Sequence, residues 1–137
     1  WDVTFYHVNG DTLQRPFNTL VDLRLSGFEE LESFAGRAVY QTVIEQSSGS
    51  ILLLKGVQKG ITELRVNGED VGSRWYGEHR YNLSGVLKPG ENQLEISYVS
   101  VLANYCRQLD DPTAKRWADY ESVPCGITGP VTLYTPN

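Results

Sequence analysis

Short runs of alternating apolar and polar residues, separated by turn signals, constrain this chain more than any other feature of its sequence. Apolar residues recur at every second position around Val3, Leu23 and Leu94, as they do on a half-buried strand. The runs span residues 1–6, 20–25, 38–45, 51–56, 61–66, 80–83, 93–99 and 130–134. Helical periodicity is nearly absent. About eight or nine short strands at this spacing predict an all-β sandwich or barrel.

Turn residues separate these strands. Asn67-Gly68 follows the run at 61–66, and it predicts a hairpin because a type I′ turn needs two residues at positive φ. Pro89-Gly90 predicts a tight turn into the strand at 93–99. The continuous apolar run at 51–54 is typical of a strand that is buried on both faces.

Length and composition favour one folded domain over residues 1–137. Hydrophobic residues make up 40% of the chain and charged residues 21%, which argues against disorder. The net charge of -5, with no run of Lys or Arg, argues against a nucleic-acid partner. No apolar run approaches the roughly 20 residues of a membrane span. Because the chain lacks Met and Trp1 already lies in a strand-like run, we expect either a piece excised from a larger multidomain protein or a processed product.

The connection between Ser100 and Pro130 contains no clear strand, and loops of that length are often functional. Within it, residues 111–120 are the best helical candidate, with an Asp at the cap and a Pro in the first turn. The two cysteines, Cys106 and Cys125, allow two interpretations. They form one disulfide in an oxidising compartment, or they are two small buried thiols.

Four local patterns occur in one order along the chain. They are F-x-G-x-A-x-Y at 34–40, V-N-G-x-x-V-G at 66–72, L-x-P-G-x-N-x-L-x-I at 87–96 and G-I-T-G-P-V-T-L-Y at 126–134. Over nearly the whole chain, this set resembles the jelly-roll sugar-binding domain of glycoside hydrolase family 2. It is even more similar to the carboxy-terminal β-sandwich of α-L-rhamnosidase-type glycoside hydrolases. Both belong to the galactose-binding-domain-like fold.

The resemblance implies an all-β jelly-roll sandwich of two antiparallel sheets, with a short helical turn in the long loop 101–129. It also implies an accessory domain that works beside the catalytic domain of the same polypeptide, in a bacterial enzyme that is secreted, periplasmic or on the cell surface. Many relatives of this fold hold a structural calcium ion. No D-x-D-x-D spacing occurs here, so we expect no cofactor, with a structural calcium ion as the alternative, and we name no metal ligand.

Catalytic patterns are missing from the sequence. His7 and His79 are the only imidazoles. No G-x-S-x-G elbow, H-E-x-x-H pair or phosphate loop occurs. The acidic residues cluster next to turns, where charged side chains are normally solvated surface. We therefore expect a non-catalytic domain.

Carbohydrate binding fits the residue types better. Sugars stack their C–H patches on aromatic rings, and their hydroxyls need hydrogen-bonding side chains. Two segments combine such residues, and the predicted carbohydrate-binding set is Trp75, Tyr76, His79, Arg80, Asn104, Tyr105, Arg107 and Trp117. In the resembled fold, the loops that carry these segments can meet at one end of the sandwich. The expected ligand is a plant-type polysaccharide or oligosaccharide.

Structural roles compete with this interpretation. Trp75 can instead cap the end of the core, and Trp117 can pin the long loop onto the sandwich. Asn104 can order its loop by hydrogen bonds, and Tyr81 is expected to pack in the core. The alternative function is a structural domain that docks on a catalytic module and binds no free sugar.

Overall fold

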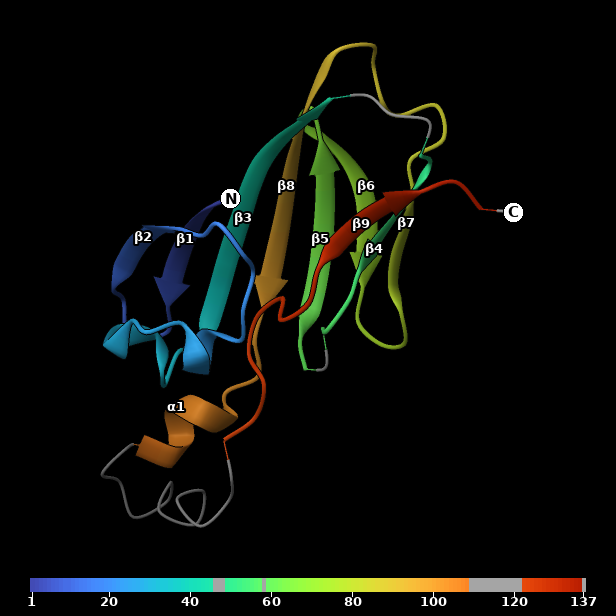
Figure 1. Ribbon diagram of the computed structural model, residues 1–137. Coiled ribbons are helices and arrows are strands. Elements are labelled where there is room, and N and C mark those ends of the chain that lie inside the picture. Colours follow the sequence, from blue (N-terminus) through green and yellow to red (C-terminus); the bar gives the residue numbers. More distant parts are fainter. Residues whose placement is uncertain (46–48, 58, 109–121, 137) are drawn as a thin grey trace.

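The protein is a sandwich of two antiparallel β-sheets (Figure 1), seen in a computed structural model that describes residues 1–45, 49–57, 59–108 and 122–136. The larger sheet has six strands in the order β2-β1-β3-β8-β5-β6, and the smaller has three in the order β7-β4-β9. The strands are β1 Asp2–His7, β2 Thr12–Pro16, β3 Gly36–Glu45, β4 Ile51–Leu54, β5 Ile61–Val66, β6 Glu69–Arg74, β7 His79–Asn82, β8 Glu91–Val99 and β9 Val131–Tyr134. The predicted all-β sandwich is therefore confirmed.

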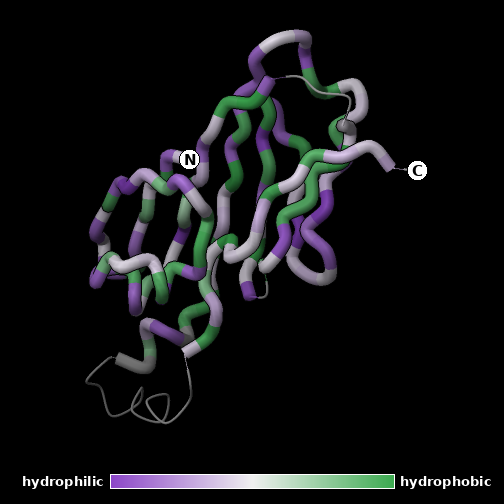
Figure 2. Tube along the Cα trace, viewed as in Figure 1, coloured by the Kyte–Doolittle hydropathy of each residue, from purple (hydrophilic) through white to green (hydrophobic). Residues whose placement is uncertain are grey.

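Alternating side chains build the core between the sheets, and Figure 2 shows hydrophobic and hydrophilic residues alternating along the strands. In β5, Thr62, Leu64 and Val66 are buried, while the residues between them are exposed. In β8, Leu94 and Ile96 face the same core. The apolar strand β4 lies between β7 and β9 and is mostly buried, as predicted.

Side-chain hydrogen bonds join the turn at Asn67-Gly68 to the turn at Pro89-Gly90. Asn67 and Gly68 both have positive φ, 51° and 83°, as a type I′ hairpin requires. The Asn67 amide donates to Asn92 Oδ1 at 2.9 Å, and Asn67 Oδ1 accepts from Gln93 N at 2.9 Å. The same Asn92 oxygen accepts from Lys88 N at 2.8 Å. The V-N-G and P-G-x-N patterns are therefore two parts of one structural feature.

Gly36 begins β3 at a place where no side chain fits. Its φ is +142°, and a Cβ atom there would overlap the backbone oxygen of Tyr6 on β1. Glycine at this position therefore lets β1 and β3 pair closely.

The predicted strand at 20–25 is wrong. That segment holds a short 3-10 helix, η1 Leu23–Leu25, and a second one follows at η2 Glu29–Leu31. The Asp22 carboxylate accepts from Arg24 N at 3.0 Å and pairs with the Arg24 guanidinium at 2.7 Å, and these local bonds favour a turn over a sheet ladder. Leu25 is 77% exposed, so the apolar alternation does not mark a buried face.

Strand β2 was not predicted. Its single aliphatic side chain, Leu13, is half-buried, and Pro16 ends it at the sheet edge, where a missing N–H is tolerated. The short helical turn expected in loop 101–129 is present as α1 Ala103–Gln108. The predicted helix at 111–120 lies outside the described residues. No helix in the described part of the chain is long and apolar enough to cross a membrane.

Candidate functional site

The loop between β6 and β7 carries an exposed aromatic pair. Trp75 is 70% exposed and Tyr76 is 72% exposed. Their ring centroids lie 4.6 Å apart at an interplanar angle of 63°. The alternative in which Trp75 caps the core is therefore wrong.

Both ends of this loop are tied to the sandwich by Arg74. Its guanidinium lies 4.7 Å from the ring centroid of Tyr81, which is fully buried, as expected for a packing residue. Arg74 Nε also donates to the backbone oxygen of Arg80 at 3.0 Å. These contacts join the last residue of β6 to β7, so the exposed pair sits on a loop with fixed ends.

Arg80 adds a positive charge beside this loop. It is exposed on β7, and its guanidinium carbon lies 5.8 Å from the ring centroid of Tyr134 on β9. Stacking on an aromatic ring orients a guanidinium while leaving its donors available for other partners.

His79 points inward and is only 4% exposed. Its Nδ1 lies 2.6 Å from Thr62 Oγ1, which in turn lies 2.8 Å from the Tyr81 hydroxyl. The Tyr81 hydroxyl donates to the backbone oxygen of Thr62 at 2.9 Å. That donation uses the tyrosine proton, so the Thr62 hydroxyl donates to Tyr81 and His79 Nδ1–H donates to Thr62.

Burial, and then the nearby charge of Arg74, lowers the pKa of His79 below its usual value of 6.5. The imidazole is therefore neutral at neutral pH and is held by the core. His79 therefore has a structural role in the core, and its Nδ1 is not available for contact with a ligand.

The second predicted segment is partly a structural clamp. Asn104 is 4% exposed, donates to Val123 O at 2.8 Å and accepts from Val123 N at 2.7 Å. This confirms the loop-ordering role considered for it. Tyr105 is half-buried, with its ring centroid 5.3 Å from that of His7. Arg107 belongs to α1, but its side chain lies outside the described set, and Trp117 lies outside the described residues altogether.

The β6–β7 loop and the segment of α1 lie at the same end of the sandwich but near opposite edges of the large sheet (Figure 1). Tyr105 contacts His7 at the end of β1, whereas Trp75 follows β6. The sheet order puts β3, β8 and β5 between those strands. Four strand spacings correspond to roughly 20 Å. The structure therefore does not bring Tyr105 and Trp75 together.

Both cysteines are free thiols rather than a disulfide. Cys125 is buried, and burial raises its pKa to about 12. A thiol with so high a pKa is a poor nucleophile at neutral pH. Across the described ranges, no three His, Cys, Asp or Glu side chains gather closely enough to hold a metal ion.

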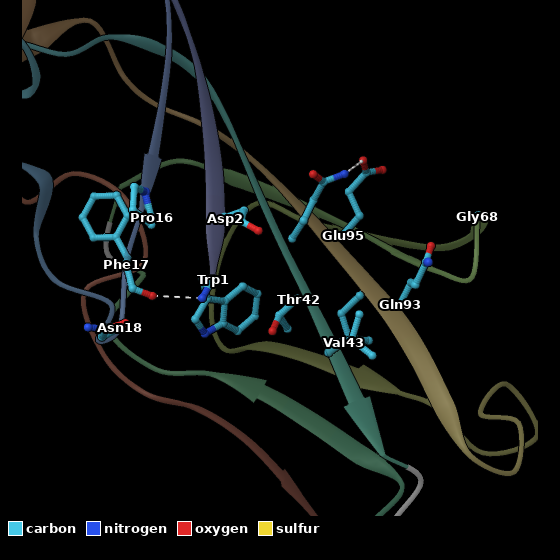
Figure 3. Close-up of a pocket in the computed structure, with 12 residues that line it drawn as sticks. Trp1, Asp2, Pro16, Phe17, Asn18, Thr42, Val43, Gly68, Gln93 and Glu95 are labelled. Carbon is cyan, nitrogen blue, oxygen red and sulfur yellow. Dashed lines mark hydrogen bonds between the residues drawn. The ribbon is translucent and has the colours of Figure 1, made fainter.

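A groove that sequence reasoning missed lies beside the start of β1 (Figure 3). Its volume is about 580 Å³, and its lining includes Trp1, Gln41, Gln93 and Glu95. These residues are far apart in the sequence. The one feature of the sequence that points to this groove is that polar residues alternate along β3 and β8 and so face one side of the sheet.

No family model and no curated protein matches the sequence. The fold is that of β-sandwich domains that occur within glycoside hydrolases. The structure of a rhamnosidase from Novosphingobium sp. PP1Y is similar to this chain with a TM-score of 0.77 and 22% identity, over 96% of this chain and 14% of that one. This agrees with the rhamnosidase-type sandwich named from the motifs.

Two β-glucuronidase structures are similar over a smaller part of the chain. For the enzyme of Dictyoglomus thermophilum, the TM-score is 0.52 at 20% identity, over 72% of this chain and 18% of that one. For the enzyme of Bifidobacterium dentium, complexed with coumarin-3-O-glucuronide, the TM-score is 0.51 at 18% identity, with the same coverage of 72% and 18%. The chain thus spans less than a fifth of each of these proteins.

Proposed function

We propose that this chain is a non-catalytic accessory domain of a secreted bacterial glycoside hydrolase, and that it binds carbohydrate through the β6–β7 loop. The similar structures support the first part, since this fold forms 14% to 18% of longer glycoside hydrolase chains. The observation that carries the second part is the exposed pair Trp75 and Tyr76, at 70% and 72% exposure.

Two large aromatic rings side by side in water leave apolar area unburied, and such area commonly marks a binding site. The pair provides the flat faces on which a sugar ring stacks its C–H patches. Because Arg74 fixes both ends of the loop through Tyr81 and the Arg80 backbone, part of the ordering cost of binding is already met.

Arg80 supplies the polar part of the proposed site. A guanidinium binds a carboxylate through two parallel hydrogen bonds, so a uronate-containing side chain of a plant-type polysaccharide is the proposed ligand class. Because little apolar area is buried, we expect a dissociation constant on the order of 10–1,000 μM. His79 supports a non-catalytic role, since its Nδ1 is engaged inside the core rather than presented to a substrate.

Titration of the 137-residue chain with acidic and neutral oligosaccharides, followed by isothermal titration calorimetry, tests this proposal. Trp75→Ala should weaken binding of the acidic ligands at least tenfold, about 1.4 kcal/mol, without lowering Tm. Tyr6→Ala is the matched control, because Tyr6 is an exposed aromatic residue on β1, away from the loop. Saturable binding that survives Trp75→Ala, or no binding across the panel, would contradict the proposal.

A structural docking role is the second candidate, and exposed apolar residues on the outer face of the large sheet favour it. Tyr6, Val99 and Ile61 are 48%, 40% and 42% exposed. They belong to one cross-strand row, in which Arg37 lies between Tyr6 and Val99. If this row packs on another module, Val99→Lys should lower the Tm of the parent polypeptide but leave that of the isolated chain nearly unchanged. An unchanged parent Tm would count against docking at this face.

A further inference from the structure

A pocket lies beside the β6–β7 loop, where β4 and β7 separate. The two strands pair as far as Leu54 and His79, and their ladder ends there. Beyond that pair, residues 55–57 and 77–78 line a cavity of about 300 Å³, at the lower end of the sandwich in Figure 1. A cavity of this volume is at the small end of ligand sites and has room for one sugar ring.

Both walls of the pocket are held in place by the sandwich. On the β4 side, Thr128 Oγ1 donates to Gly56 O at 2.6 Å. Gly56 has a φ of +81°, and a Cβ atom there would overlap the Thr128 side chain. Glycine therefore lets the chain turn toward Thr128 on the β9 side and away from β7. On the β7 side, the bond from Arg74 Nε to Arg80 O fixes the loop ends.

The hydrogen-bond chain in the core decides which nitrogen of His79 is free to face the pocket. Tyr81 donates its proton to Thr62 O, so the Thr62 hydroxyl donates to Tyr81 and accepts from His79 Nδ1–H. The neutral imidazole therefore carries its proton on Nδ1, and Nε2 is an acceptor.

The Nε2 atom of His79 reaches the surface. No described residue makes a hydrogen bond to Nε2, and the described part of the chain holds no buried side-chain nitrogen or oxygen that lacks a partner. An unpaired Nε2 must therefore touch solvent. Because His79 lines the pocket, Nε2 is the acceptor at its floor.

Two opposite charges complete the lining. Lys55 follows β4, Glu78 precedes β7, and both side chains are exposed. Within the described ranges, no hydrogen bond or ion pair engages either side chain, so both are available to a ligand. Because their charges cancel, the pocket does not select by charge. A carboxylate and a bare imidazole nitrogen both accept from hydroxyl groups, and an ammonium group donates to sugar oxygens.

We propose that this pocket is a second subsite of the β6–β7 loop and holds the sugar ring next to the one stacked on Trp75. One hydroxyl of that ring donates to His79 Nε2, another donates to the Glu78 carboxylate, and Lys55 donates to a sugar oxygen. The subsite rests on the proposed function of the loop, since Glu78 and His79 follow the aromatic pair directly in the chain. It narrows the ligand class to acidic oligosaccharides of at least two rings, with free hydroxyls on the ring in the pocket.

The protonation of His79 is tested first, without a ligand. In the ¹⁵N-labelled chain at neutral pH, long-range ¹H–¹⁵N NMR spectra distinguish a protonated ring nitrogen from a bare one. The chain has two histidines, so His7→Gln assigns the signals. We expect a proton on Nδ1 and a bare Nε2. A proton on Nε2 would overturn the proposal.

Binding of acidic disaccharides then tests the pocket. The probes are disaccharides of one uronic acid and one neutral sugar, and deoxy analogues that each lack one hydroxyl. The disaccharide should bind at least about tenfold more tightly than the uronic acid alone and should shift the His79 Nε2 signal. One deoxy analogue should lose at least about tenfold in affinity and leave that signal unmoved, because its absence of a hydroxyl leaves the acceptor unpaired.

Glu78→Gln should weaken binding of the disaccharide at least about fivefold, since it removes a charged acceptor. Its Tm should stay unchanged, because Glu78 is exposed. Glu63→Gln is the matched control, since Glu63 is an exposed glutamate on β5, outside the pocket. If Trp75→Ala weakens binding but Glu78→Gln does not, or if the Nε2 signal never moves, the subsite is overturned and the proposed function stands. If no acidic ligand binds, or if binding survives Trp75→Ala, both are overturned.

Discussion

Asn92 joins two turns from inside the sheet, and its replacement by Ala should destabilise the fold strongly. The side chain is fully buried and makes four hydrogen bonds. Its oxygen accepts from Asn67 Nδ2 and Lys88 N, and its nitrogen donates to Lys88 O at 2.8 Å and Gly90 O at 3.2 Å.

Each hydrogen bond contributes a net ~0.5–1.5 kcal/mol to stability. Lys88 and Gly90 are exposed residues, so water can replace some of the lost partners in the variant. We therefore expect Asn92→Ala to lower the free energy of unfolding by about 2–4 kcal/mol. For a domain of this size, that corresponds to a fall of about 10 °C in Tm.

Urea unfolding and thermal scans of Asn92→Ala measure this loss directly. Asn82→Ala is the control, since Asn82 is exposed and its Oδ1 accepts one hydrogen bond from Ser84 N at 2.9 Å. The control should lose less than about 1 kcal/mol. If Asn92→Ala were no less stable than Asn82→Ala, the view that Asn92 holds the two turns together would be refuted.

Three further predictions concern the core and the pairing of β1 with β3. Burial lowers the pKa of His79, so between pH 6.5 and its lower folded pKa the unfolded chain binds a proton that the folded chain does not. The free energy of unfolding, measured in urea, should therefore fall as the pH drops below 6.5, and His79→Gln should flatten that decline. Thr62→Val removes the hydroxyl between His79 and Tyr81 and should cost about 1–3 kcal/mol in urea unfolding, whereas a change below about 0.5 kcal/mol would argue against the hydrogen-bond chain. Gly36→Ala should lower the free energy of unfolding by about 3 kcal/mol, because the new Cβ would overlap β1. The control Gly27→Ala, at φ +86° with open space around it, should lower it by only about 1 kcal/mol. Thermal unfolding measures both losses, and equal losses would refute the steric argument.

Much of the fold was predictable because its signals are local. The Asn67-Gly68 hairpin followed from the φ values that its turn requires, and the strand around Leu64 followed from alternation alone. The error at 20–25 arose because the alternation there looks the same as in a strand. The Asp22 carboxylate, which binds the Arg24 backbone and guanidinium, instead favours a 3-10 turn.

The candidate sites were less predictable. The aromatic residues of the β6–β7 loop were recognised from their types. Their exposure could not be known, because it depends on which elements pack around the loop. The long-loop segment was expected to meet them, yet the sheet order places Tyr105 and Trp75 at different sides. The groove was missed because Asp2, Gln41 and Glu95 become neighbours only through strand pairing.

The sequence by itself determined where this chain turns and which residues form most of its strands, because glycine dihedrals and a two-residue period act over a few positions. The tertiary structure decided which strands pair and which side chains reach the solvent, because both depend on contacts between distant segments. Tyr81 and Trp75 make this plain. They lie six positions apart in one aromatic stretch, yet Tyr81 is fully buried under Arg74, and Trp75 is 70% exposed.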